Sequence, residues 1–160
     1  MSRRARFIIA LGFVLGIFGC RNKAPYEGKS VAELERMLRD SDPAVQTQGA
    51  FGLGRLGPQA RSAVPALIEA LKKDANVRQN AARALGQIGP EAKEAVPALI
   101  DALGDSEWSV RRQAALALGQ VGPDARPAVP ALKKLGNDPD KLVRRASEEA
   151  IKKIQVGAAK

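Results

Sequence analysis

Residues 64–71 read Val-Pro-Ala-Leu-Ile-Glu-Ala-Leu, and residues 96–103 repeat them as Val-Pro-Ala-Leu-Ile-Asp-Ala-Leu. Similar segments begin at Val31 and Val129, so successive segments start 33, 32 and 33 residues apart. A fixed period of this length is typical of repeat proteins, in which each unit packs only on its neighbours. The pattern therefore predicts four repeats, which together fill residues 30–156.

Each repeat is predicted to form two helices. In the first helix, Val64, Leu67, Ile68 and Leu71 have the i, i+3, i+4, i+7 spacing of a helix that is buried on one face. The second helices start near four equivalent valines: Val45, Val77, Val110 and Val143. Gly-Pro pairs at 57–58, 89–90 and 122–123 are expected to end them, because glycine closes a helix in the left-handed conformation and proline cannot extend it.

Composition limits the chemistry that the chain can perform. Aromatic residues make up 4% of the sequence, which favours a core of small and aliphatic side chains between helices. The chain has no histidine, so the commonest general base and transition-metal ligand is absent. A single cysteine excludes an intramolecular disulfide and a thiolate cluster. We expect an all-α fold with no catalytic residue, no metal site and no cofactor.

The amino terminus has the plan of an export signal. Arg3, Arg4 and Arg6 precede residues 7–18, an uninterrupted run of twelve apolar or glycine residues. A membrane span needs roughly 20 apolar residues, whereas the apolar part of a signal peptide needs about 7–15. The run is therefore expected to belong to a leader rather than to a permanent anchor.

The leader closes with Ile-Phe-Gly-Cys at residues 17–20, which resembles the lipobox of bacterial lipoproteins. The resemblance implies a signal peptide at 1–19, lipid attachment at Cys20 and a lipidated tether at 20–29. It places the protein in the bacterial cell envelope, and Arg21 after the cysteine favours the outer membrane. Two alternatives remain: an uncleaved anchor, and ordinary cleavage that leaves a free thiol.

The repeat motif itself is Val-Pro-Ala-Leu-Ile, an acidic turn residue, Val-Arg, and then Ala-Ala-x-Ala-Leu-Gly-x-Ile-Gly-Pro. It resembles the short HEAT-like repeats, including those of phycobilisome-lyase-like proteins, over residues 31–155. Ankyrin repeats need a histidine that the chain lacks. The only tyrosine, Tyr26, lies outside the repeats, contrary to tetratricopeptide repeats. The resemblance implies a right-handed α-solenoid of four two-helix repeats.

The same resemblance implies a ladder of ion pairs that ties neighbouring repeats together. Its acid and arginine positions correspond to Asp74 with Arg78, Glu107 with Arg111, and Asp140 with Arg144. The first repeat has Asp42 but carries Gln46 in the arginine position. In the fourth repeat Lys133, Gly136 and Glu148 replace an isoleucine, a leucine and an alanine, which predicts an end cap that faces water.

A solenoid of this kind presents an extended surface along its second helices, and we expect function to lie there. Arg83, Arg112 and Arg145 occur on successive second helices at positions that the core does not need, and solenoid geometry is expected to align them. The candidate partner surface consists of Phe51, Arg83, Trp108, Arg112, Leu116 and Arg145. An ordinary solvated face is the alternative interpretation.

The expected partner is a protein of acidic character, because the chain carries a formal charge of +9. The membrane is the second partner, through the lipid at Cys20. We expect a monomeric interaction scaffold that does not bind nucleic acid. The alternatives are a lyase-like accessory protein, which the resemblance suggests, and a nucleic-acid-binding solenoid, which the charge suggests; the export signal opposes both.

Overall fold

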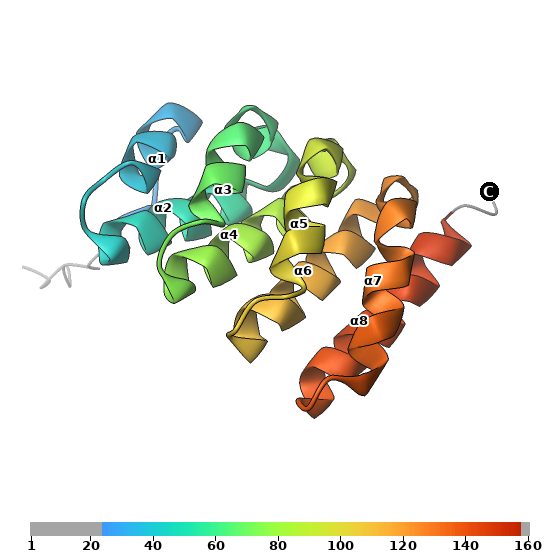
Figure 1. Cartoon of the computed structure of the whole chain (residues 1–160). Helices are drawn as coiled ribbons and strands as arrows, with labels where there is room; N and C mark the ends of the chain where they lie inside the picture. Colours follow the sequence, from blue (N-terminus) through green and yellow to red (C-terminus); the bar gives the residue numbers. More distant parts are fainter. Residues whose placement is uncertain (1–23, 158–160) are drawn as a thin grey trace, which may run out of the picture.

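The computed structural model describes residues 24–157, so the predicted leader and Cys20 lie outside the described residues. Residues 24–157 contain helices and turns and no strand, which confirms the all-α class. The helices form four successive pairs (Figure 1). Their bounds are α1 Val31–Leu38, α2 Pro43–Leu56, α3 Val64–Ala70, α4 Ala75–Ile88, α5 Val96–Ala102, α6 Trp108–Val121, α7 Val129–Lys134 and α8 Lys141–Val156.

The first helix of every repeat begins at the valine that the sequence pattern marks. At the start of α1, the backbone amide of Ser30 donates to Glu33 Oε2 at 2.9 Å, and the amide of Glu33 donates to Ser30 Oγ at 3.4 Å. This reciprocal capping box satisfies amides that a helix start leaves free. The second helices begin two residues before their valines, so each includes two residues that the sequence pattern leaves in the preceding loop.

The Gly-Pro pairs end the second helices as predicted. Gly57, Gly89 and Gly122 have positive φ angles of 56°, 75° and 81°, which side chains disfavour. The chain that follows each glycine is a 3₁₀ helix rather than irregular loop: η1 Gly57–Ala63, η2 Gly89–Ala95 and η3 Gly122–Ala128. A further short turn, η4 Leu135–Asn137, follows α7.

The second helices pack directly on one another through small residues. A Cβ on Gly86 of α4 would lie 2.9 Å from the Cα of Ala117 on α6. A Cβ on Gly119 of α6 would lie equally close, at 2.9 Å, to the Cα of Ala150 on α8. The first helices make far less contact with their neighbours. The second helices therefore form the more closely packed layer of the array, and we call the surface along them the inner face.

The fourth repeat differs from the others where a cap is expected. Ala50, Ala82 and Ala115 occupy one repeat position and are fully buried. Glu148 occupies the same position in α8 and is exposed, as are Lys133 and Gly136. Lys133 and Glu148 therefore place charge where the second and third repeats have half-buried or buried apolar residues, as expected of an end cap.

The segment before the first helix is more closely attached to the repeats than a tether would be. Tyr26 is half-buried, and its ring centroid lies 4.9 Å from that of Phe51 on α2 at an interplanar angle of 60°. Gly52 provides room for this contact, since a Cβ there would lie 2.9 Å from Tyr26 Cβ. The packed unit therefore begins before residue 30, and at least Tyr26 of the predicted tether belongs to it.

Candidate interaction surface

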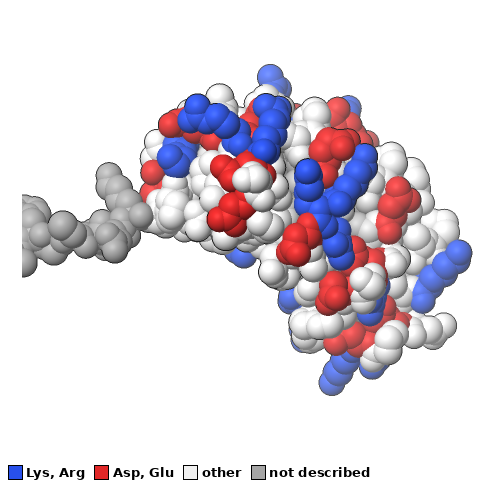
Figure 2. All heavy atoms as spheres, turned by 60° about the vertical axis from the view of Figure 1, so that its left-hand side comes forward, with Lys and Arg blue, Asp and Glu red and all other residues white. Residues whose placement is uncertain are grey.

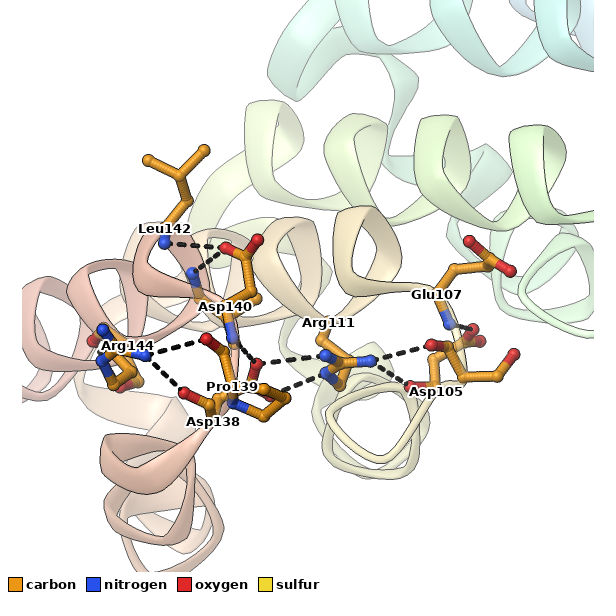
Figure 3. Close-up of polar contacts among 11 residues, drawn as sticks. Asp105, Glu107, Arg111, Asp138, Pro139, Asp140, Leu142 and Arg144 are labelled. Carbon is orange, nitrogen blue, oxygen red and sulfur yellow. Dashed lines mark hydrogen bonds and ion pairs between the residues drawn. The ribbon is translucent and has the colours of Figure 1, made fainter.

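Two arginines of the second helices bind aspartates of the following repeat. Arg78 Nε donates to Asp105 Oδ2 at 2.7 Å, and Arg111 Nε donates to Asp138 Oδ2 at 2.7 Å. A second nitrogen of each guanidinium reaches the other carboxylate oxygen, at 2.8 Å and 3.0 Å. Figure 3 shows Arg111 lying between the turn of its own repeat and Asp138 of the next. These fork-shaped pairs fix the register of adjacent repeats.

The ladder predicted from the resemblance exists, but its acidic members are different residues. Asp74 and Asp140 cap their own helices, accepting from the amides of Asn76 at 3.0 Å and Leu142 at 2.7 Å. The carboxylate of Glu107 points away from Arg111 (Figure 3). The pairing acids lie two residues earlier in the turn, where the chain passes beside the arginine of the preceding repeat. The expected pairs Asp74–Arg78, Glu107–Arg111 and Asp140–Arg144 are therefore wrong.

The ion pairs change the ionisation of their carboxylates. The hydrogen bond from Arg111 holds the pKa of the Asp138 carboxyl below its ordinary value, against the effect of burial. Burial raises the pKa of Asp105, but hydrogen bonds from Arg78 and the Glu107 amide outweigh it, and the net pKa is lowered. The same pairs raise the pKa of both arginines. All four groups are charged at neutral pH.

The boundary between the first and second repeats has no such pair. Gln46 stands in the arginine position, and Lys72 stands where the later repeats have Asp105 and Asp138. Gln46 still donates to the carbonyl of Asp40 in its own turn, as Arg111 does to the carbonyl of Asp105. Lys72, in the turn after α3, pairs with Glu69 of that helix at 3.1 Å. At this boundary, both the arginine and the aspartate of the later ion pairs are thus replaced, by Gln46 and Lys72.

The inner face has a groove of about 300 Å³ between α6 and α8. Two arginines at equivalent repeat positions, Arg112 and Arg145, stand at its sides. The complete lining is Arg112, Leu116, Leu142, Arg145, Ala146 and Glu149. Three of the six residues of the predicted partner surface therefore come together here.

Charge within this groove is mostly positive. Glu149 pairs with Lys153 at 2.7 Å, one helical turn further along α8. The hydrogen bond from Lys153 lowers the pKa of Glu149, and the charges of Arg145 and Arg112 lower it further. Among residues 24–157, neither Arg112 nor Arg145 has a carboxylate within ion-pair distance. Their guanidinium groups are therefore available to a ligand.

Phe51 and Arg83 lie elsewhere on the inner face. The guanidinium carbon of Arg83 lies 5.0 Å from the centroid of the Phe51 ring, a cation–π distance. Tyr26 packs on the same ring, so Phe51 is held between the amino-terminal turn and the second repeat. Arg83 occupies the repeat position of Leu116, one turn along from that of Arg112 and Arg145. It does not line the groove between α6 and α8.

Trp108 is the first residue of α6 and is 44% exposed. Leu142, in the first turn of α8, is 46% exposed and projects away from the polar cluster of the turn (Figure 3). Leu142 is not among the residues predicted from the sequence. The signal was present, because the equivalent residues of the second and third repeats are the polar Asn76 and Ser109. An apolar residue at a position that is polar in its neighbours indicates a local role.

The remaining surface does not point to another kind of site. On the face seen in Figure 2, acidic and basic side chains are interspersed rather than gathered in a field of one sign. No group of three or more His, Cys, Asp or Glu side chains within residues 24–157 could hold a metal ion. In the same part of the chain, no helix has the length and hydropathy that a membrane span requires.

Comparison with known families agrees with this architecture. The profile of HEAT repeats matches residues 31–95 and 64–152. The chain belongs to the HEAT-repeat family. A search of curated proteins found no match. HEAT and armadillo-like solenoids typically serve as scaffolds for protein interactions, and this HEAT-repeat chain has their fold.

Several solved structures share the fold of this HEAT-repeat protein. An engineered protein is 28% identical, with a TM-score of 0.65, over 79% of this chain and 63% of its own. A designed armadillo repeat protein in complex with the peptide (KR)4 is 18% identical, with a TM-score of 0.68, over 78% and 64%. The CpcE–CpcF complex of phycocyanin lyase from Nostoc sp. is 23% identical, with a TM-score of 0.58, over 82% and 68%. The chain spans less than two thirds of the first two proteins.

Proposed function

We propose that this HEAT-repeat protein is a membrane-tethered scaffold that binds an acidic protein partner on its second-helix face. The observation that carries the proposal is the groove between α6 and α8, where Arg112 and Arg145 have no carboxylate partner within the described chain. Trp108 and Leu142 are exposed at the starts of the same two helices. Exposed tryptophan and arginine are the side chains that most often anchor a protein partner.

The known peptide complex of the fold supports a peptide or protein partner, although the peptide in it is basic. The designed armadillo protein, which shares the fold, is in complex with a peptide of lysine and arginine. Without the leader arginines Arg3, Arg4 and Arg6, the chain from Cys20 has 23 basic and 17 acidic residues and a formal charge of +6. Arg112 and Arg145 on its inner face have no carboxylate partner in the described residues, so the complementary partner is acidic.

Tethering rests on the amino-terminal sequence. The lipobox-like residues 17–20 favour lipid attachment at Cys20, and a short segment then leads to the packed turn that contains Tyr26. We infer a location on a membrane of the bacterial cell envelope, with the outer membrane favoured by Arg21. The scaffold would then hold its partner close to that membrane.

We infer no catalysis by this chain. It contains no histidine, and Asp105 and Asp138 are engaged in structural ion pairs. The likeness to the CpcE–CpcF lyase, at 23% identity, concerns the fold alone.

The test is chemical crosslinking of the full chain in native membranes, followed by purification and identification of the adduct. The wild type should give a discrete adduct with one protein. Reversal of Arg83, Arg112 and Arg145 to glutamate should remove the adduct without altering the helical spectrum. The matched control reverses Lys93, Arg126 and Lys133, three exposed cations that lie outside the second helices. A wild type without an adduct, or equal loss in both variants, would refute the proposed function.

A further inference from the structure

We propose that the groove between α6 and α8 binds a peptide segment in which an aliphatic side chain is flanked by carboxylates. This inference rests on the proposed function and assigns the chemistry of one subsite within it. The proposed ligand is a peptide, and the alternative anionic ligand, a nucleic acid, is tested beside it.

The carboxylate preference comes from the two arginines. Arg112 and Arg145 occupy the same position in successive repeats, 33 residues apart, so they stand on neighbouring helices on either side of the groove. Glu149, the acid nearest to them in the lining, is already bound to Lys153 at 2.7 Å. Each guanidinium can therefore present its paired donors to an incoming carboxylate.

The aliphatic preference comes from the rest of the lining. Leu116 provides half-buried apolar surface beside the buried Ala146, and Leu142 stands 46% exposed at one end. Trp108 precedes Arg112 by four residues and therefore lies on the same side of α6. Among the described residues, Trp108 and Leu142 are two of the three large apolar side chains that are exposed. An aliphatic side chain between the carboxylates would cover this surface.

The distribution of charge favours a peptide over a nucleic acid. The positions equivalent to Arg112 and Arg145 on α2 and α4 are the neutral Thr47 and Gln79. One helical turn after Arg145, the groove is lined by the acidic Glu149, which would repel a phosphate. A nucleic-acid strand is held by cations that follow its phosphates over many residues, and two arginines beside an apolar floor do not provide such a track.

The probe is an eight-residue peptide of alternating glutamate and leucine, titrated into the full chain in mild detergent. Trp108 is the only tryptophan of the chain and lies one helical turn before Arg112 on α6, so its emission reports on the side of α6 that carries Arg112. Binding should shift this emission to shorter wavelength, and added salt should weaken it. Peptides of alternating glutamine and leucine, or lysine and leucine, should give no shift at the same concentration.

Charge reversal supplies the decisive comparison. Arg112→Glu with Arg145→Glu should weaken binding of the glutamate–leucine peptide by about tenfold or more. The control variant Lys93→Glu with Arg126→Glu makes the same change in net charge away from the groove and should bind within about twofold of the wild type. Leu142→Ser should weaken binding while leaving its salt dependence unchanged. Equal weakening in the two charge variants, or no binding by the wild type, overturns the proposal.

A single-stranded oligothymidine of twenty nucleotides is the competing probe. If it changes the Trp108 emission at a lower concentration than the glutamate–leucine peptide does, the commitment to a peptide is wrong. Failure here is distinguishable from failure of the proposed function. An adduct in membranes that survives the Arg112→Glu, Arg145→Glu change would leave the scaffold function in place and refute only this groove as its site.

Discussion

Arg111 on α6 donates to both carboxylate oxygens of Asp138 in the following repeat, at 2.7 and 3.0 Å. Its third nitrogen donates to the carbonyls of Asp105 and Ser106 in its own turn, at 2.8 and 2.9 Å. One guanidinium therefore joins two successive turns. Side-chain exposures of 14% for Arg111 and 4% for Asp138 place the pair largely out of water. Removal of either partner would leave a buried charge without compensation.

Asp138→Asn should lower the free energy of unfolding by about 2 kcal/mol at pH 7, the usual size for a hydrogen bond between charged groups. The pKa of Asp138 is lowered in the folded state. Its stabilising effect is therefore complete above the unfolded pKa of about 3.9 and is lost as the pH falls through the folded value. Urea unfolding of wild type and variant should converge in acid. Asp124→Asn, at an exposed acid, is the control, and a pH-independent difference at Asp138 would contradict the account.

The double substitution Gln46→Arg, Lys72→Asp should create the missing pair between the first two repeats. We expect the double variant to be more stable than the wild type by about 1 kcal/mol, and each single variant to gain less than half of this. A double-mutant cycle from urea unfolding measures the coupling. The reverse change, Arg78→Gln with Asp105→Lys, gives the second boundary the residues of the first and should destabilise the protein. Additive single effects would mean that these positions do not meet.

Gly86→Ala should destabilise the array by about 1–2 kcal/mol, although alanine is the better helix former. The new methyl group would lie 2.9 Å from the Cα of Ala117, and it would also meet Oε1 of Gln120, so α4 and α6 must move apart. Gly136→Ala is the matched control, because its Cβ would meet nothing within 4 Å. Thermal unfolding followed by circular dichroism compares the two. A neutral Gly86→Ala would show that the second helices do not need this close approach.

Much of the fold was predictable from the sequence because the signals are periodic and local. The starting valines and the Gly-Pro ends each depend on residues within one repeat. The close packing of second helices through alanine follows from the same spacing. Such features need no knowledge of how one repeat sits on the next.

The partner of each ladder arginine was not predictable in the same way. Asp105 and Glu107 both lie in one turn, two residues apart, and both are acidic. Which of them reaches Arg78 depends on the path of the turn beside the preceding repeat, and the sequence does not encode that path locally. Asp105 and Asp138 also stabilise their own turns. Asp105 accepts a hydrogen bond from the Glu107 amide and Asp138 accepts one from the Asp140 amide, each at 2.9 Å.

The candidate surface was predicted in part. Helical spacing selected Arg112, Leu116 and Arg145, which line one groove. The same reasoning placed Arg83 in one set with Arg112 and Arg145, although it lies one turn away and stacks on Phe51. Leu142 was missed because it falls before the periodic part of α8, in a turn that the pattern did not assign to a helix.

Cys20→Ser should abolish lipid labelling and leave the precursor unprocessed. The reason is chemical, since a thiol is the acceptor in the lipobox reaction that residues 17–20 resemble. Incorporation of a labelled fatty acid in growing cells, followed by fractionation, makes the measurement. Arg21→Ser, beside the expected acceptor, should retain the label. Labelled fatty acid in the Cys20→Ser protein would contradict the assignment.

Site-specific photocrosslinking tests the central claim, partner binding on the inner face, most directly. A photoreactive amino acid is placed at Leu116 or Gln79 on the second helices, or at Asp101 or Lys133 on the first helices, in the full chain in living cells. Each of these side chains is at least partly exposed. The account predicts one common adduct from Leu116 and Gln79 and none from Asp101 and Lys133. An adduct formed from the first-helix positions alone, or none from any of the four, would contradict it.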